Sequence, residues 1–283
     1  MVSSMVPEIR EAPYRKNLMG PTAVRLVVFL CLLTTGGCSR RPVSPLSDVP
    51  AVPLSAEETG RVLELLEQQG ESVQRYQAVV RVRGKGPEGK FRATELIIFE
   101  RPDRVRVELV ATFGASRWIA VASAGEITVL FPRSREYLEE SAVEDVVGAL
   151  LGIRLSPLEV MAILAGTGLP VTPSSLVRAE RHGEKVRLFL KEGRVEVEGD
   201  QVREAQREGY RVIYPTDWKQ TERAAPDRIE LVSNGLEASL SVDDLDINVR
   251  LDPEAFVVTV PDGADRLGLA QIGGEAVFVK SSQ

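Results

Sequence analysis

Apolar and more polar residues alternate along much of this chain, and this period of two constrains its fold more than any other feature. The pattern runs through residues 78–83, 104–109 and 127–131. Because successive side chains of a strand point to opposite faces, such segments predict strands with one buried face, as in antiparallel sheets. Further strands are predicted over residues 185–191, 194–198, 201–207, 210–214, 228–232, 237–242, 247–251 and 256–260.

Three segments carry helix signals instead of alternation. Ser55 with Glu58, and Ser141 with Glu144, have the spacing of capping boxes. The third helix start has Ser156 as N-cap, a proline at the first helical position and Glu159 at the third. These signals predict helices over roughly residues 55–70, 141–151 and 156–165. About a dozen strands and three helices, in no repeating strand–helix order, argue against a doubly wound α/β fold. We expect one mainly β domain over residues 55–283.

The first 37 residues are predicted to be a lipoprotein signal peptide. Residues 26–33 are apolar but too few to span a bilayer, basic residues precede them, and small residues lead to Cys38. This order resembles the lipobox of bacterial lipoproteins, with Thr35 where leucine is usual. Cys38 is therefore expected to be lipidated and to anchor the chain in a membrane.

Two alternatives to lipidation stay open: a chance cysteine after an ordinary signal peptide, and an anchor that is not cleaved. Cysteine usage favours lipidation, because Cys31 would leave with the signal and Cys38 would be the only thiol of an exported chain. Ser39, where an aspartate would resemble an inner-membrane retention signal, suggests the outer membrane. Residues 38–54 contain four prolines and are predicted to be an extended tether.

Composition excludes several classes of function. The net charge is −6 with a sequence pI of about 5.2 and no basic run, which disfavours nucleic-acid binding. One histidine, His182, and two cysteines are too few for a His/Cys zinc site. No glycine-rich phosphate loop and no set of nucleophile, base and oxyanion donors is recognisable. We therefore predict no catalytic residues, no metal, no cofactor and no enzymatic activity.

Several stretches of the chain resemble the Lol lipoprotein-localisation carriers. They are residues 101–109 (RPDRVRVEL), 150–153, 163–166, 208–214 (EGYRVIY), 226–231 and 246–248. The lipobox makes the lipidated, LolB-like receptor type the closer analogue. The resemblance implies a half-open antiparallel β-barrel of about eleven strands covered by helices. It also implies an outer-membrane lipoprotein, facing the periplasm, that binds lipoprotein acyl chains or lipid and has a periplasmic carrier protein as partner.

Ten candidate cavity residues come from strand positions whose side chains are expected to point inward and from the predicted helices. They are Val82, Leu96, Val107, Leu109, Trp118, Phe131, Leu150, Met161, Leu164 and Tyr214. The resemblance also implies a membrane-facing loop with Phe113 at its tip. Two other interpretations stay open: these residues fill a closed core, and Phe113 is buried. Correspondingly, the chain could be a regulatory sensor or a structural outer-membrane lipoprotein with the same fold.

Overall fold

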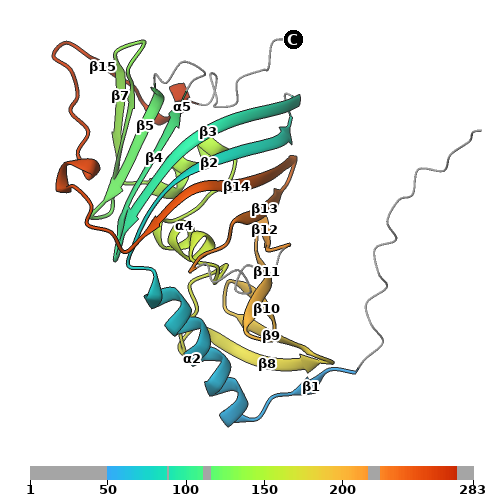
Figure 1. Ribbon diagram of the computed structural model, residues 1–283. Coiled ribbons are helices and arrows are strands. Elements are labelled where there is room, and N and C mark those ends of the chain that lie inside the picture. The colour runs from blue at the N-terminus through green and yellow to red at the C-terminus, as the bar shows by residue number, and fades with distance from the viewer. Residues whose placement is uncertain (1–49, 88, 111–115, 216–223, 273–283) are drawn as a thin grey trace, which may run out of the picture. The chain divides into compact units, whose positions relative to one another are not determined.

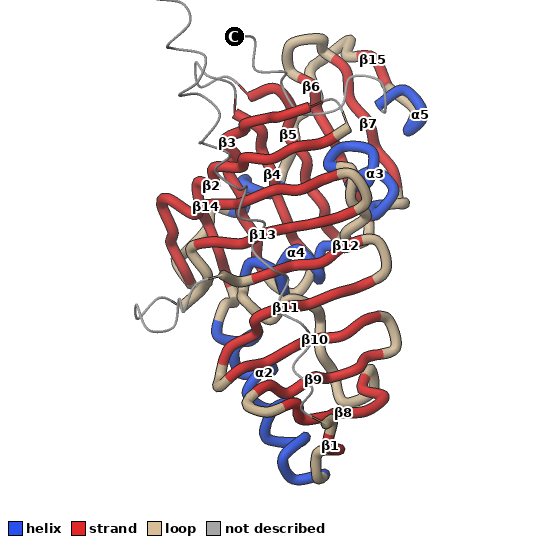
Figure 2. Tube along the Cα trace, turned by 90° about the vertical axis from the view of Figure 1, so that its right-hand side faces the viewer, coloured by secondary structure: helices blue, strands red, loops and turns tan. Residues whose placement is uncertain are grey.

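A single sheet of fifteen strands organises the chain (Figures 1 and 2). In spatial order the strands are β1 (Val52–Pro53), β8 (Leu176–His182), β9 (Lys185–Leu190), β10 (Gly193–Glu198), β11 (Gln201–Arg207), β12 (Tyr210–Ile213), β13 (Arg228–Ser233), β14 (Leu236–Ile247), β2 (Arg75–Gly86), β3 (Gly89–Glu100), β4 (Arg104–Val110), β5 (Ser116–Ser123), β6 (Glu126–Phe131), β7 (Glu136–Glu140) and β15 (Asp265–Arg266). The computed structural model describes residues 50–87, 89–110, 116–215 and 224–272, which belong to one compact unit, Val49–Gln283.

The sheet is antiparallel and open. Every neighbouring pair of strands is antiparallel except β7 and β15, which run parallel. The outermost strands β1 and β15 do not pair with each other, so the sheet does not close into a full barrel. The predicted half-open, mainly β fold is confirmed, with fifteen described strands rather than about eleven.

Four α-helices and one short 3₁₀-helix accompany the sheet in the described ranges. They are α2 (Ala56–Ser72), α3 (Val143–Leu151), α4 (Pro157–Leu164), η2 (Pro253–Phe256) and α5 (Leu269–Ile272). Two of the predicted capping boxes are confirmed: Ser55 accepts from the Glu58 amide at the start of α2, and Ser156 accepts from the Glu159 amide at the start of α4. Sequence signals therefore located both helix starts correctly.

The capping box predicted at the start of α3 is wrong. Ala142 occupies the N-cap position, and it provides no side-chain hydrogen bond to the helix. Ser141 lies one residue too early to reach the amide that a capping box requires. At its other end, α3 stops at Gly152, whose φ of 70° is a left-handed conformation that glycine adopts at little cost.

The inner face of the sheet is the face that packs against α3 and α4, and every second residue of β2–β6 lies on it. In β4 these residues are Val105, Val107 and Leu109. Strand register places Ile97 of β3 and Ala120 of β5 beside Val107. The alternation that predicted these strands therefore corresponds to one continuous apolar inner surface.

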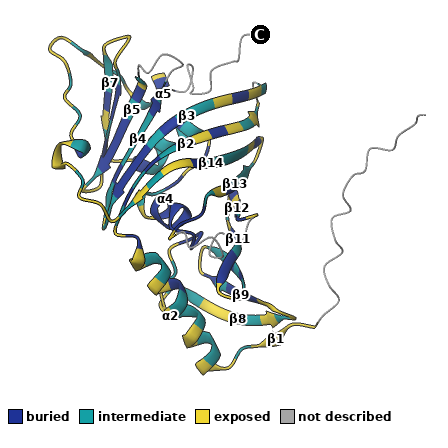
Figure 3. Cartoon of the chain, in the orientation of Figure 1, coloured by how far each residue is buried: buried dark blue, intermediate teal, exposed yellow. Residues whose placement is uncertain are grey.

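Two apolar clusters cover the inner face. The larger cluster joins α2 and α4 to β2, β3 and β8–β14, and the smaller joins α3 and α5 to β4–β7. All residues from Met161 to Leu169 are buried, so the second half of α4 is enclosed on every side (Figure 3). By contrast, only Leu66 of the 17 residues of α2 is fully buried, and the rest of this helix borders solvent.

The strands predicted over residues 247–251 and 256–260 are not formed. Asn248 has a φ of 57°, which ends β14, and its side chain donates to the Ser72 carbonyl and accepts from the Gln74 amide. Pro253, which lacks a backbone donor, begins the 3₁₀-helix η2. The segment therefore leaves the sheet and covers part of it.

This segment packs on the outer face, opposite to α3 and α4. Phe256 of η2 forms a third apolar cluster with Ile98 of β3 and Val121 of β5. The Arg106 guanidinium donates to the Ala255 carbonyl at 3.0 Å, which fixes the segment over β4. The outer faces of β3 and β5 are therefore apolar and covered at this point, while β4 between them presents the Arg106–Glu108 ion pair.

Candidate ligand-binding site on the inner face

Nine of the ten predicted cavity residues lie on the inner face or on the elements that cover it. Val82, Met161, Leu164 and Tyr214 belong to the larger cluster, Leu109, Trp118, Phe131 and Leu150 belong to or pack against the smaller, and Val107 packs against both. The structure thus brings the nine residues to one face, divided between two clusters. Their role as ligand contacts stays a prediction.

Leu96 was assigned to the wrong face. It packs in the outer-face cluster with Ile98 and Phe256, behind the interior it was predicted to line. Four consecutive apolar residues, 96–99, obscure the alternation in this part of β3, because the outer face is covered here as well. Which of these residues point to the inner face becomes clear only from the pairing with β4, which places Ile97 beside Val107.

Two predicted functional residues lie outside the described residues. These are Cys38, the predicted lipidation site, and Phe113, the predicted membrane-facing residue. Described residues at the end of the predicted tether do pair with the sheet: Val52 and Pro53 form β1 on the edge of β8, and the Leu54 amide donates to the Ala179 carbonyl at 3.0 Å.

A narrow apolar cavity of about 40 Å³ lies between α3, the start of α4 and strands β4–β6. Every lining residue is apolar, and the predicted residues Val107, Trp118 and Leu150 are among them. Ligand pockets for small molecules typically measure roughly 300–1,000 Å³. A long apolar ligand therefore fits here only if a covering helix moves away from the sheet.

Two larger pockets are more polar and open. One, of about 560 Å³, lies among the turns of β9–β14 beside Arg194 and Arg211, and the other, of about 360 Å³, lies beside the start of α4. Both arginines pair with Glu204, at 3.2 and 3.6 Å. Because both guanidinium groups already share a carboxylate partner and the walls are hairpin ends, the small apolar cavity is the better candidate for an apolar ligand.

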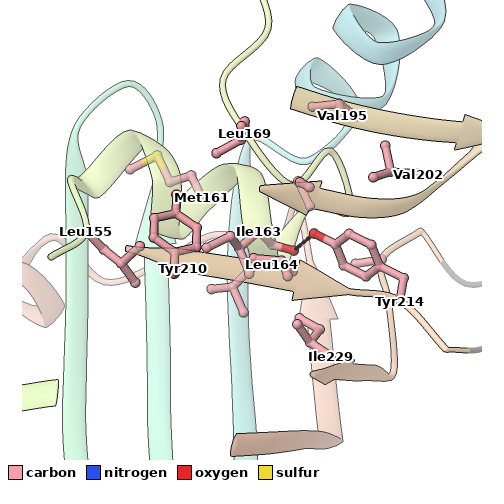
Figure 4. Close-up of a cluster of buried hydrophobic side chains, with 14 of the residues drawn as sticks. Leu155, Met161, Ile163, Leu164, Leu169, Val195, Val202, Tyr210, Tyr214 and Ile229 are labelled. Atoms are coloured by element: carbon pink, nitrogen blue, oxygen red, sulfur yellow. Dashed lines mark hydrogen bonds between the residues drawn. The ribbon is translucent and has the colours of Figure 1, made fainter. Parts of the chain in front are cut away.

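Helix α4 is fixed to the sheet at both ends by polar contacts. At its start, Glu159 accepts hydrogen bonds from Arg207 at 2.5 Å and from the Tyr210 hydroxyl at 2.6 Å. At its end, the Tyr214 hydroxyl donates to the Ile163 carbonyl at 2.8 Å (Figure 4). These contacts, together with complete apolar burial, make α4 part of the fixed framework.

We call these polar contacts of Glu159 and Tyr214 the α4 clamp. The pKa of Glu159 shows that its carboxylate is well hydrogen-bonded there. Burial alone would raise the pKa of its carboxyl, but hydrogen bonds from Arg207, Tyr210 and Ser156 outweigh burial and hold the pKa below its ordinary value. The Tyr210 phenol has its pKa raised, first by burial and then by donating to Glu159. Glu159 is therefore an ionised, structural carboxylate.

Helix α3 is held differently. Among the described residues, the one polar contact that joins it to the sheet is the 3.9 Å ion pair of Glu144 with Arg207. Its other ion pair, Asp145 with Arg154, is local and exposed. Val143, Val146 and Leu150 are buried in the smaller cluster, so apolar packing provides most of its attachment. Non-directional contacts of this kind are equally available to an apolar ligand.

Two buried polar atoms on the inner faces of β2 and β5 have no hydrogen-bond partner among the described residues: the Tyr76 hydroxyl and the Trp118 indole Nε1. On β3 between them, Glu95 is 6% exposed, and its carboxyl makes no hydrogen bond or ion pair with a described residue. Burial raises the pKa of Glu95 to about 7, and no neighbouring charge counteracts it. Unpartnered groups of this kind are rare in folded proteins.

Neither buried glutamate was identified from the sequence. For Glu95 the sequence did contain a signal. It alternates in step with Phe91, Ala93 and Ile97, so one acidic residue interrupts the apolar residues of β3 that point to the inner face. For Glu159 the capping box with Ser156 accounted for the residue, and its bond to Arg207, 48 positions away, follows only from the fold.

The described ranges hold no other recognisable chemistry. They contain no group of three or more His, Cys, Asp or Glu residues that could hold a metal ion. None of their helices has the length and hydrophobicity needed to cross a membrane.

Comparison with known proteins yields similarity of structure only. No protein-family model matches the chain, and no curated protein sequence matches it significantly. Among solved structures, a LolA superfamily protein, NE2245 from Nitrosomonas europaea, is similar with a TM-score of 0.48 and 12% identity over 70% of this chain and 97% of that chain.

Two further structures are similar to the same extent. A DUF1329 family protein from Desulfovibrio piger and an outer membrane lipoprotein-sorting domain from Vibrio parahaemolyticus each have a TM-score of 0.47 and 8% identity. Each covers 70% of this chain and 96% of its own. Because all three TM-scores lie below 0.5, what this chain binds has to be inferred from its own residues.

Proposed function

We propose that this chain is a lipid-anchored envelope protein that binds lipoprotein acyl chains, or a similar hydrophobic ligand, between α3 and the inner face of its sheet. The observation that supports this most is the unequal attachment of the two covering helices around an entirely apolar cavity. Helix α4 is clamped by Glu159 and Tyr214, whereas α3 is held mainly by apolar contacts. Displacement of α3 would enlarge the cavity without breaking the clamp.

Ligand binding would replace one set of apolar contacts with another. Each buried methylene contributes roughly 0.8 kcal/mol, so an acyl chain of ten or more carbons can compensate for the contacts that α3 gives up. Such binding needs no directional bond to the chain itself, which suits a protein that must also release its cargo. The role in lipoprotein localisation, the LolB-like type and the outer-membrane address are inferred from the sequence motifs.

The test is binding of a fluorescent acyl probe to the unit Val49–Gln283, which contains every described helix and strand. Leu151→Glu places a charge on α3 at the cavity and should weaken binding at least about tenfold, because the carboxylate would have to be desolvated. Leu158→Glu, at a position of α4 that is 49% exposed, is the matched control and should bind like wild type. Equal binding by both variants would remove the site from this cavity.

A second function has its own support. A narrow cavity of about 40 Å³ is also what a packed core would leave, which favours a structural lipoprotein with the same fold. Native mass spectrometry of the unit purified without detergent separates the two. Copurified lipid that is released on denaturation supports a carrier, and a bare protein that takes up no acyl probe supports the structural role.

Anchoring through Cys38 is a separate proposal with a separate test. Wild-type protein should incorporate radiolabelled palmitate, and Cys38→Ser should abolish the label and leave unprocessed or soluble protein. Absence of label from the wild type would contradict the lipoprotein interpretation. It would leave the proposed cavity unaffected.

Phe113 is proposed as a membrane contact used during transfer. In that role, Phe113→Ala should slow delivery of cargo to liposomes and leave the melting temperature unchanged. If Phe113 is instead a core residue, the same substitution should lower the free energy of unfolding by about 3–5 kcal/mol. A thermal melt of this variant distinguishes the two.

A further inference from the structure

Glu95 lies in the middle of an otherwise apolar row across the inner face. Strand register places it between Val80 of β2 and Leu109 of β4, and Leu109 in turn beside Trp118 of β5. Along β3 its neighbours on the same face are Ala93 and Ile97. All of these side chains lack charge, and the Glu95 carboxyl has no hydrogen bond or ion pair among the described residues.

An acid in this position disfavours folding. Transferring a carboxyl group from water to an apolar interior without a compensating hydrogen bond is costly, and a leucine or valine would pack there without that cost. Its elevated pKa reflects the same lack of compensation. A buried polar group that lacks a partner in the protein is explained if a ligand supplies the partner.

Trp118 provides a second, independent observation in the same row. Its indole Nε1 is buried without an acceptor, and its ring lines the apolar cavity under α3. Only β4 lies between β3 and β5, so the backbones of Glu95 and Trp118 are about 10 Å apart. An unmet acceptor and an unmet donor thus lie on the same face, with Leu109 between them.

We propose that Glu95 and Trp118 form the polar end of the acyl site and that the ligand is an amphiphile with an amide head group, whose N–H donates to Glu95 and whose carbonyl accepts from Trp118. The apolar tail would lie under α3, along Val107 and Ala120. This inference rests on the proposed function and specifies its ligand class. A free fatty acid fits poorly, because its carboxylate would meet a second carboxyl group without a donor.

Three probes of equal chain length test the head group: decanamide, N,N-dimethyldecanamide, which lacks the N–H, and decanoate. Calorimetry at pH 8 on the unit Val49–Gln283 should show decanamide binding about tenfold or more tighter than the other two, the discrimination expected when a charged acceptor loses its donor. In Glu95→Leu, decanamide and its dimethyl analogue should bind within about twofold of each other. Trp118→Phe should weaken both amides by the same factor.

The outcomes separate this inference from the proposed function. If all three probes bind wild type equally, the acyl site stands and the amide head group is wrong. If Glu95→Leu still binds decanamide more tightly than its dimethyl analogue, another residue accepts the N–H of the head group and the assignment of Glu95 is wrong. If no probe binds wild type, both proposals fail. Glu95→Gln keeps an acceptor oxygen and should retain part of the preference, while far-UV circular dichroism checks that each variant is folded.

Discussion

Two buried glutamates, Glu95 on the inner face of the sheet and Glu159 on the covering helix α4, have opposite environments. Glu159 is 3% exposed and Glu95 is 6% exposed, so burial alone does not distinguish them. Glu159 accepts hydrogen bonds from Ser156, Arg207 and Tyr210, which hold its pKa below the ordinary value despite burial. Glu95 has no such bond with any residue that the structure describes, and burial raises its pKa to about 7.

The same contrast extends to the regions around the two residues. Around α4, the hydroxyls of Tyr210 and Tyr214 are both hydrogen-bonded, and the helix is clamped. On β2 and β5, Tyr76 and Trp118 keep unpartnered polar atoms, and an apolar cavity adjoins a helix that is held by packing. One region is complete without a ligand, and the other has groups for a ligand to satisfy.

The largest expected effect comes from breaking the clamp. Glu159→Leu should lower the free energy of unfolding by about 4 kcal/mol, because Tyr210 loses its partner, Arg207 loses the shortest of its ion pairs and the capping box of α4 is lost. For a domain of this size the melting temperature should fall by about 10 °C. Glu159→Gln, which can still cap α4, should lose much less. A Glu159→Leu melt within about 2 °C of wild type would show that the clamp does not hold α4.

Glu95→Leu should instead raise the free energy of unfolding at pH 8. The unfolded-state pKa near 4.5 lies below the folded value of about 7, so the unfolded chain loses its proton first and wild-type stability falls between those pH values. The total loss is roughly 3 kcal/mol, and Glu95→Leu should recover it at pH 8 and recover none of it at pH 4. Urea unfolding at both pH values measures this difference. A destabilised variant at pH 8 would mean that Glu95 has a stabilising partner in the free protein.

A smaller effect compares two buried tyrosines. Tyr214→Phe should cost about 1 kcal/mol, since the Ile163 carbonyl loses one of its two donors. Tyr76→Phe should be neutral or slightly stabilising, because its hydroxyl has no partner to lose. Both variants keep the aromatic ring, so their difference in melting temperature isolates the hydroxyl. Equal losses would contradict the distinction between the two regions.

Much of the fold could be predicted from the sequence because local signals agreed with tertiary structure. Alternation identified β2, β4 and β6, and capping boxes located the starts of α2 and α4. The predictions failed where two faces of an element were apolar, as around Leu96, or where one residue decided the conformation, as at Asn248. In both cases the deciding interaction came from a segment distant in sequence: the one that carries Phe256 for Leu96, and Ser72 and Gln74 for Asn248.

The candidate site was less accessible to prediction. Strand alternation and the predicted helices together placed nine of the ten residues on the inner face or on the elements that cover it, because a strand fixes the direction of each side chain. It could not show that α3 is held by packing and α4 by hydrogen bonds, since that depends on Arg207 and Tyr214 reaching α4 from β11 and the end of β12. The isolation of Glu95 likewise follows from its register against Val80 and Leu109.

Hydrogen–deuterium exchange with and without a saturating acyl ligand tests the central claim most directly. In the free protein, amides of α3 should exchange about tenfold or more faster than those of α4, because α3 opens locally at lower cost. Added ligand should slow exchange across residues 143–151 and leave residues 161–165 unchanged. Equal protection of α3 and α4, with no response of either to ligand, would contradict the claim that α3 covers a ligand site.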